Sequence, residues 1–365
     1  MIGLPQHNIF KSVEDRIHER PMFFNPYAFG SSVIGGWKEL GRTTLGSSGD
    51  TIDVSSVADK RYYMILGSQL TASGGKIQSG MRLGNGSADS GTNYSNRYSQ
   101  DGGADITGTS QNSAYAFTAG IEQDCDTFRV GYLANLSAKE KLWQNHIISQ
   151  SAAGATTVPV RGEGVGKWVN TSNPIDYFRS INAEVGSYAT GSELVILGWD
   201  DADTHTTNFW EQLADITGSA SANISTGTVT AKKYLWGQIW YDRASTFNVR
   251  LQFNNDTASN YSVRLSDNGG ADGTGTSQAY IDMDAGGTSG KPNFTNFFII
   301  NNSANEKLLM ANTVQANTAG ASNAPSRREI VGKWANTSAQ ITEIDFNTST
   351  STFPAGARLK LWGSN

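Results

Sequence analysis

The sequence is poor in several features on which common function classes depend. A single cysteine, Cys125, among 365 residues excludes an intrachain disulfide and a cysteine-based zinc cluster. Charged residues make up 17% of the chain, the net charge is −5 and there is no basic run, so we expect no nucleic-acid binding through an electrostatic footprint. No apolar run approaches the about 20 residues of a membrane-spanning helix. The N-terminus has no basic start followed by an apolar stretch, so we expect no secretory signal.

Residue patterns typical of catalysis are also scarce. There are four histidines and no Gly-X-Ser-X-Gly turn for a nucleophilic serine. Gly162–Lys167 resembles a phosphate-binding loop, but Trp168 follows the lysine where a magnesium-binding Ser or Thr is required. Two carboxylate pairs, Asp105 with Asp272 and Glu140 with Glu306, leave glycoside hydrolysis open as an alternative. We predict a protein without enzymatic activity and without a cofactor.

What the chain has in abundance is glycine, with 40 residues, together with Ser, Thr and Asn, which favour tight turns. Between the turns lie short segments in which apolar and polar residues alternate. In Phe247–Phe253, for example, the four apolar residues point to one face. We expect roughly eight strands in each half of the chain, which is typical of a β-sandwich or jelly roll.

The sequence also repeats itself. Residues 93–105 (NYSNRYSQDGGAD) return as 260–272 (NYSVRLSDNGGAD), and residues 165–172 (VGKWVNTS) return as 331–338 (VGKWANTS). Since both segments return after nearly the same interval, we predict two tandem homologous β-sandwich or jelly-roll domains, at 37–201 and 207–365. Each has the length of an ordinary single domain.

Residues 1–36 lie outside the repeat. Ile9, Val13 and Ile17 are spaced four apart and share one helical face, and Pro21 ends that pattern. A short helix packed on the first domain, an arm that docks into a larger assembly and a disordered segment are the alternatives for these residues. We assign the segment as a docking arm whose anchors are Ile9, Phe10, Val13, Ile17, Phe23, Phe24 and Tyr27.

Two further sets of residues are candidate binding sites. Asp101, Asp105, Asn268 and Asp272 lie in Gly-rich segments that are typical of turns, and they are weak candidates for calcium. Tryptophans shared by both copies, Trp37/Trp210 and Trp168/Trp334, are expected in the cores. The tryptophans found in one copy are freer to bind a ligand, and Trp143, Trp236 and Trp240 are the candidate contacts.

Several segments resemble modules in virion proteins of tailed bacteriophages. They are residues 251–261 (LQFNNDTASNY), 266–277 (SDNGGADGTGTS), 330–341 (IVGKWANTSAQI) and the ending 355–363 (AGARLKLWG). The resemblance covers both copies and transfers no catalytic residues. It implies a component of the virion surface, either a tail fibre or receptor-binding protein, or a capsid decoration or head fibre.

These observations lead to one expected function and one alternative. We expect a non-enzymatic structural protein of a virion, assembled in the host cytoplasm. It would be attached to other virion proteins through residues 1–36 and organised as a homo-oligomer. The alternative is a pair of carbohydrate-binding modules that recognise glycans on a cell surface.

Overall fold

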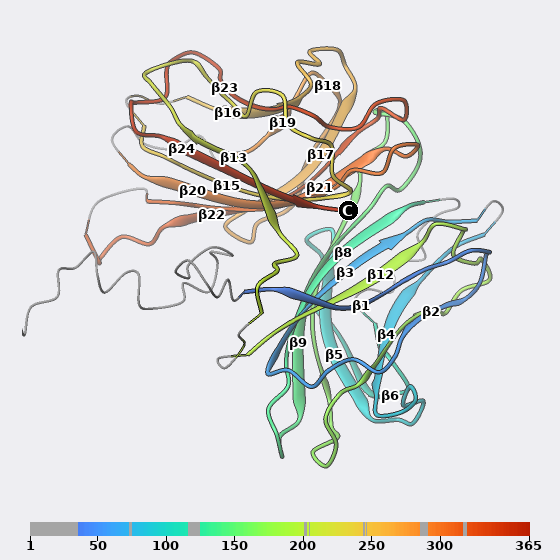
Figure 1. The fold of residues 1–365 in the computed structure, drawn as a ribbon. Helices are drawn as coiled ribbons and strands as arrows, with labels where there is room; N and C mark the ends of the chain where they lie inside the picture. The colour runs from blue at the N-terminus through green and yellow to red at the C-terminus, as the bar shows by residue number, and fades with distance from the viewer. Residues whose placement is uncertain are drawn as a thin grey trace, which may run out of the picture.

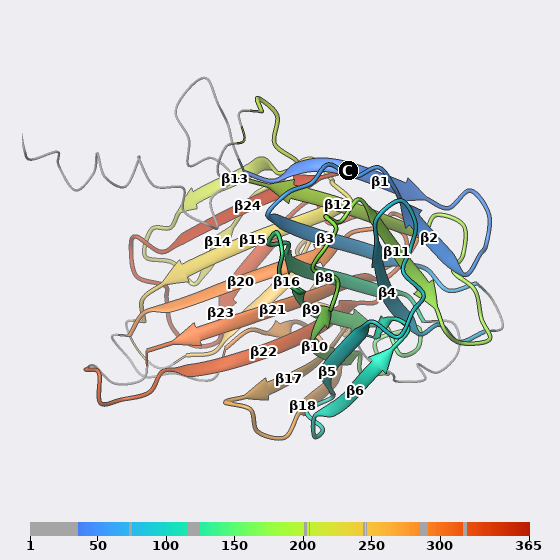
Figure 2. The ribbon, with the colours of Figure 1, turned by 90° about the horizontal axis from the view of Figure 1, so that it is seen from below.

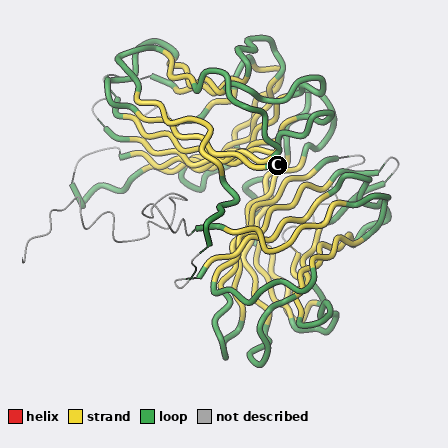
Figure 3. Tube along the Cα trace, in the orientation of Figure 1, coloured by secondary structure: helices red, strands yellow, loops and turns green. Residues whose placement is uncertain are grey.

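The computed structural model describes residues 36–72, 75–115, 125–200, 203, 205–243, 245, 247–284, 291–316 and 320–365. Within these ranges all regular structure is β-strand and no residue is helical (Figure 3). The expected all-β fold class is therefore confirmed. The predicted anchors Ile9, Phe10, Val13, Ile17, Phe23, Phe24 and Tyr27 lie outside the described residues.

The first twelve strands, which we call unit 1, form two antiparallel sheets (Figure 1). The large sheet has the order β1-β12-β3-β8-β9-β10-β5-β6, and the small sheet has the order β2-β11-β4-β7. The strands are β1 (Lys38–Thr44), β2 (Thr51–Val54), β3 (Tyr62–Gln69), β4 (Ser79–Gly84), β5 (Tyr94–Gln100), β6 (Ile106–Gln111), β7 (Ala114–Tyr115), β8 (Thr127–Ala134), β9 (Lys141–Ser149), β10 (Val160–Trp168), β11 (Tyr177–Asn182) and β12 (Glu193–Trp199).

The remaining strands, which we call unit 2, follow the same arrangement. The large sheet is β13-β24-β15-β20-β21-β22-β17-β18 and the small sheet is β14-β23-β16-β19. The strands are β13 (Glu211–Thr217), β14 (Asn223–Ser225), β15 (Tyr234–Tyr241), β16 (Val249–Phe253), β17 (Tyr261–Asp267), β18 (Gly273–Gln278), β19 (Ile281–Asp282), β20 (Asn293–Ile300), β21 (Lys307–Gln315), β22 (Ser326–Trp334), β23 (Ile344–Thr348) and β24 (Arg358–Ser364).

The twelve strands that the described residues of each unit form exceed the roughly eight that the sequence predicts. The strands that the alternation misses are short or polar. β6 and β18 read ITGTSQ and GTGTSQ and stay largely exposed because each lies at the edge of its large sheet. An edge strand that buries neither face has no reason to alternate apolar and polar residues.

Each unit has a core between its two sheets. The unit 1 core includes Trp168 and the unit 2 core includes Trp334, both 1% exposed. Their indole nitrogens donate to carboxylates at matching places in the two units, Asp89 and Asp256, each at 2.7 Å. The prediction that Trp168 and Trp334 are core residues is confirmed.

A third apolar core joins the two units. It lies between the faces of the large sheets that point away from the small sheets, and it includes Phe128 and Ile148 of unit 1 with Trp236, Trp362 and Leu308 of unit 2. Figure 2 shows that the two large sheets follow the same strand order from top to bottom. Strand β9 approaches β21, and β10 approaches β22. Separation of the units would expose the apolar side chains of this core to water, so the units form one body rather than two independently moving domains.

Candidate functional site

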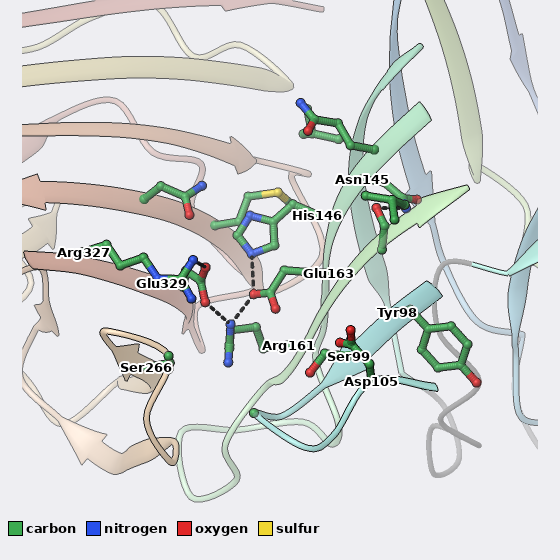
Figure 4. A pocket seen from close by; sticks show the side chains of 18 of the residues that line it. Tyr98, Ser99, Asp105, Asn145, His146, Arg161, Glu163, Ser266, Arg327 and Glu329 are labelled. Carbon is green, nitrogen blue, oxygen red and sulfur yellow. Dashed lines mark hydrogen bonds and ion pairs between the residues drawn. The ribbon is translucent and has the colours of Figure 1, made fainter. Parts of the chain in front are cut away.

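A cleft of about 610 Å³ lies beside this third core, between strands of the two large sheets (Figure 4). Unit 1 lines it with β5, β8, β9 and β10, and unit 2 lines it with β20, β21, β22 and the turn after β17. The floor includes Val130, Phe298 and Met310 from the edge of the apolar core, whereas the wall is charged.

Arg161 is the central residue of the charged wall. Its side chain is 2% exposed, and its guanidinium contacts Glu163 of its own strand. From unit 2, it binds Glu329 through Nη1 at 2.8 Å and Asp272 through Nη2 at 2.8 Å. Arg327, which occupies the same place in β22 as Arg161 does in β10, binds Glu329 Oε1 at 3.2 Å. A buried arginine shared by three carboxylates crosslinks the units with charge-assisted bonds.

The four weak calcium candidates are engaged by protein groups. Asp101 accepts the backbone N–H of Arg161 at 2.9 Å and pairs with Arg264 at 3.1 Å. Asp272 binds Arg161, as described above. Asp105 pairs with Arg97 at 3.2 Å, and Asn268 accepts the backbone N–H of Arg327 at 3.0 Å.

The local backbone agrees with a turn at these positions. Asp101–Gly102 and Asn268–Gly269 have positive φ at both residues, as tight hairpin turns require. Among the residues that the structure describes, no group of three or more His, Cys, Asp and Glu side chains is arranged to hold a metal ion. Arg264 of unit 2 pairs with Asp101 at 3.1 Å and with Asp272 at 3.6 Å, so the structure brings these two carboxylates together across the units.

Glu163 and His146, which both line the cleft, have strongly shifted pKa values. Burial raises the pKa of Glu163 to about 7, against the opposing attraction of Arg161 and with a further increase from Glu329. Burial and the nearby Arg161 lower the pKa of His146 to about 4. His146 is therefore neutral at physiological pH, with its Nε2 atom 3.6 Å from Glu163.

A carboxyl group with a pKa near 7 beside a second carboxylate is the arrangement from which general acid catalysis is built. Here, however, Arg161 binds both Glu163 and Glu329 directly. A general acid needs an oxygen free to reach the leaving group of a substrate. The geometry accounts for Glu163 and Glu329 more simply as the two sides of an ion-pair bridge between the units.

Sequence reasoning did not single out Glu163 and Glu329, although a signal was present. Both residues sit two places after an arginine and recur at the same interval as the VGKW segment. Glu140 and Glu306, a second glutamate pair at this interval, lie elsewhere: Glu140 pairs with Lys167 at 2.9 Å and Glu306 with Lys333 at 3.7 Å. The structure does not bring Glu140 to the cleft.

The three tryptophans that the sequence offers as ligand contacts differ in their exposure to solvent. Trp143 is 8% exposed in the core of unit 1, and Trp236 is 2% exposed in the core between the units. Trp236 stacks on Phe298 with ring centroids 5.7 Å apart. Trp240, four residues later on the same strand, is 44% exposed. Of the three, Trp240 is the one available to a ligand in this conformation.

Comparison with known proteins adds little to this geometry. No protein-family model matches the sequence, and no curated protein matches it significantly. Among solved structures, domains LG4-5 of the mouse laminin alpha1 chain are 10% identical, with 91% of this chain and 92% of that chain covered, at a TM-score of 0.18. OpdQ of Pseudomonas aeruginosa is 6% identical, with 83% and 97% covered, at a TM-score of 0.13. Neither TM-score is high enough to support an argument about function. In the described part of the chain no helix has the length and apolarity to cross a membrane.

Proposed function

We propose that this protein is a non-enzymatic structural protein on the surface of a tailed-phage virion, either a tail fibre or receptor-binding component or a capsid decoration. The sequence resemblance supplies the virion context. The observation that supports a structural role is the apolar core between the units, which makes two sandwiches one rigid body. Rigidity of this kind suits a surface component that must hold its shape outside the cell.

The contacts in the cleft support the non-enzymatic part of the proposal. Glu163, Glu329 and Asp272 all bind Arg161, and Asp101 binds Arg264. Apart from the Glu163 pair, which lies within unit 1, these ion pairs join the two units, where they contribute to the geometry and specificity of the contact. This part of the proposal would be contradicted if the wild type hydrolysed a glycan and if Glu163→Gln abolished that activity while leaving the fold intact.

Location on the particle is the direct test. Purified particles would be analysed by mass spectrometry and by electron cryo-microscopy, and we expect this chain in a fixed copy number at the head or the tail. A variant lacking residues 1–35 should fold, as judged by circular dichroism, but should not be incorporated, because we assign the arm as the anchor. Infectious particles that lack the chain would refute the virion proposal.

One observation favours the alternative of glycan binding. Trp240 and Phe294 are cross-strand partners on β15 and β20, and both are exposed. Neighbouring aromatic rings on a sheet face can stack on sugar rings. A glycan array probed with the wild type and with Trp240→Ala tests this alternative. If it holds, Trp240→Ala loses glycan binding, whereas the control Val185→Ala, a change in an exposed loop, keeps it.

A further inference from the structure

The core between the units contains equivalent residues of both large sheets, such as Trp37 and Trp210, and also residues whose counterparts in the other unit lie outside it. Unit 1 contributes Leu66, Phe128 and Ile148, which we call patch A. Unit 2 contributes Phe298, Leu308, Met310 and Val331, which we call patch B. An interface between two unlike patches is heterologous, and it leaves one copy of each patch unused.

Strand register identifies the unused copies. In unit 1, β3 pairs Ser68 with Phe128, and in unit 2, β15 pairs Trp240 with Phe294. Phe294 is therefore the counterpart of Phe128 in patch A, and Trp240 is the counterpart of Ser68 at the edge of that patch. The counterpart of Leu66 is Gln238, so the apolar part of patch A in unit 2 is Phe294 and Val314, with Trp240 beside them. The same comparison applies to the next pair of strands. β8 of unit 1 pairs Tyr132 with Gln144, and β20 of unit 2 pairs Phe298 with Met310 at the equivalent position. Patch B of unit 1 therefore consists of Tyr132, Leu142, Gln144 and Val165.

The unused patch A of unit 2 is an exposed apolar surface. Trp240 is 44% exposed, Phe294 is 38% exposed and Val314, the counterpart of Ile148, is 44% exposed. These are three of the large apolar side chains that the described protein exposes to solvent. Exposed apolar side chains gathered on one sheet face mark an interaction surface.

The unused patch B of unit 1 is also exposed, and it is concave. Leu142 is 55% exposed and Val165 is 52% exposed. They line a groove of about 710 Å³ together with Tyr62, Tyr132 and the edges of Trp37 and Trp143. Its counterpart in unit 2, with Leu308 and Val331, is the surface that buries patch A of unit 1.

A turn at the edge of each patch supports the match. In the interface within the chain, Asn302, in the turn after β20, donates to Ser68 Oγ at 3.1 Å. The counterparts of these two residues are Leu136 and Trp240, which are 45% and 44% exposed. A polar pair that is in contact inside the chain is thus replaced by two apolar residues, one on each unused patch. Their exposure is explained if they meet each other between two chains.

An ion pair between the units also has exposed counterparts on the two unused patches. Asp272 of unit 2 binds Arg161 of unit 1 at 2.8 Å. Their counterparts, Asp105 of unit 1 and Arg327 of unit 2, have side chains that are 51% and 60% exposed. Opposite charges at these positions would form the same bridge between chains, and they favour one relative orientation of the two patches.

We propose that copies of this chain assemble head to tail, with patch A of unit 2 in one chain docked on patch B of unit 1 in the next. The contact repeats the arrangement that already joins the two units within a chain. Such an interface closes into a ring if the rotation between units allows it, and otherwise extends as a filament. This inference stands on the interface within the chain and does not depend on the proposed virion location.

The test uses the full-length protein and two charge substitutions, Val165→Glu in patch B and Trp240→Glu in patch A. Sedimentation velocity would be measured over a dilution series reaching about 1 mM, which covers weak as well as tight association. We expect the wild type to form larger species as concentration rises. Each variant should associate at least about 30-fold more weakly, the factor that corresponds to loss of a hot-spot side chain. Val185→Glu, at a side chain 91% exposed in a loop, is the matched control and should behave as the wild type.

Mixing the two variants gives the sharpest outcome. Val165→Glu keeps patch A, and Trp240→Glu keeps patch B, so an equimolar mixture should form a dimer and nothing larger. Leu142→Glu is a second patch B variant in case Val165→Glu disturbs the fold, which circular dichroism would report.

Four results would overturn the proposal. The first is a wild type that stays monomeric throughout the series, and the second is self-association of Trp240→Glu alone that is as strong as that of the wild type. The third is association that appears only after residues 1–35 are removed, since this would assign the groove to the arm. The fourth is a monomer that binds a glycan through Trp240.

Discussion

Substitution of Trp236 by alanine should uncouple the two units. Trp236 lies on the face of β15 that points toward unit 1, at 2% exposure. Its ring centroid is 5.0 Å from Trp362, 5.6 Å from Trp210 and 5.7 Å from Phe298. Truncation of a buried tryptophan to alanine costs about 3–5 kcal/mol. All three rings belong to unit 2, but the side chain lies in the core that Phe128 and Ile148 of unit 1 complete, so part of this loss should fall on the contact between the units.

The assay is differential scanning calorimetry combined with hydrogen exchange. We expect the wild type to unfold in one transition and Trp236→Ala to unfold in two, with faster exchange in β8 and β9, whose Phe128 and Ile148 belong to the same core as Trp236. Trp334→Ala is the matched control because it removes a tryptophan that is 1% exposed within the unit 2 core. This control should destabilise unit 2 without a separate effect on β8 and β9.

The reasoning would be refuted if Trp236→Ala lowered the free energy of unfolding by less than about 1 kcal/mol, the size of an ordinary substitution. It would equally be refuted if Trp236→Ala left exchange in unit 1 unchanged while unfolding in one transition. Either result would mean that the apolar core between the units contributes little to holding them together.

Two other changes test the charged contacts. Burial raises the pKa of Glu163 from 4.5 in the unfolded chain to about 7 in the folded one. The contribution of Glu163 to stability is therefore full below pH about 4.5 and is lost as pH rises through about 7. Urea unfolding should show this decline in the wild type and in the control Glu140→Gln, but not in Glu163→Gln. Arg243 and Asp284 are both buried and paired, and Asp284 Oδ2 also accepts from Tyr241 at 3.2 Å and from the backbone of Val249 at 3.0 Å. Asp284→Ala should therefore cost about 3–5 kcal/mol in urea unfolding, because it leaves the guanidinium buried without a counter-charge; a cost below about 1 kcal/mol would contradict this account.

The sequence by itself determined the secondary structure of each unit to a useful extent. Alternation such as that of Phe247–Phe253 predicted buried strands, and β16 shows that alternation with Val249, Leu251 and Phe253 buried. The turn chemistry of Asp101 and Asn268 was also readable, because a Gly-Gly pair after Asp or Asn favours positive φ. These signals are local, since a strand or a turn depends on residues that are neighbours along the chain.

Only the tertiary structure decided which apolar residues are available for binding. Trp236 and Trp240 are four residues apart on one strand and point to the same face of the sheet, yet one is buried and the other is 44% exposed. Trp236 packs on Trp210, Trp362 and Phe298 in the core that unit 1 completes, and Trp240 lies outside that core. In the same way, Glu163 and Glu329 meet at Arg161 although they are far apart in the sequence. Contacts between sheets depend on how two whole units are placed against each other, and no local pattern of residues records that placement.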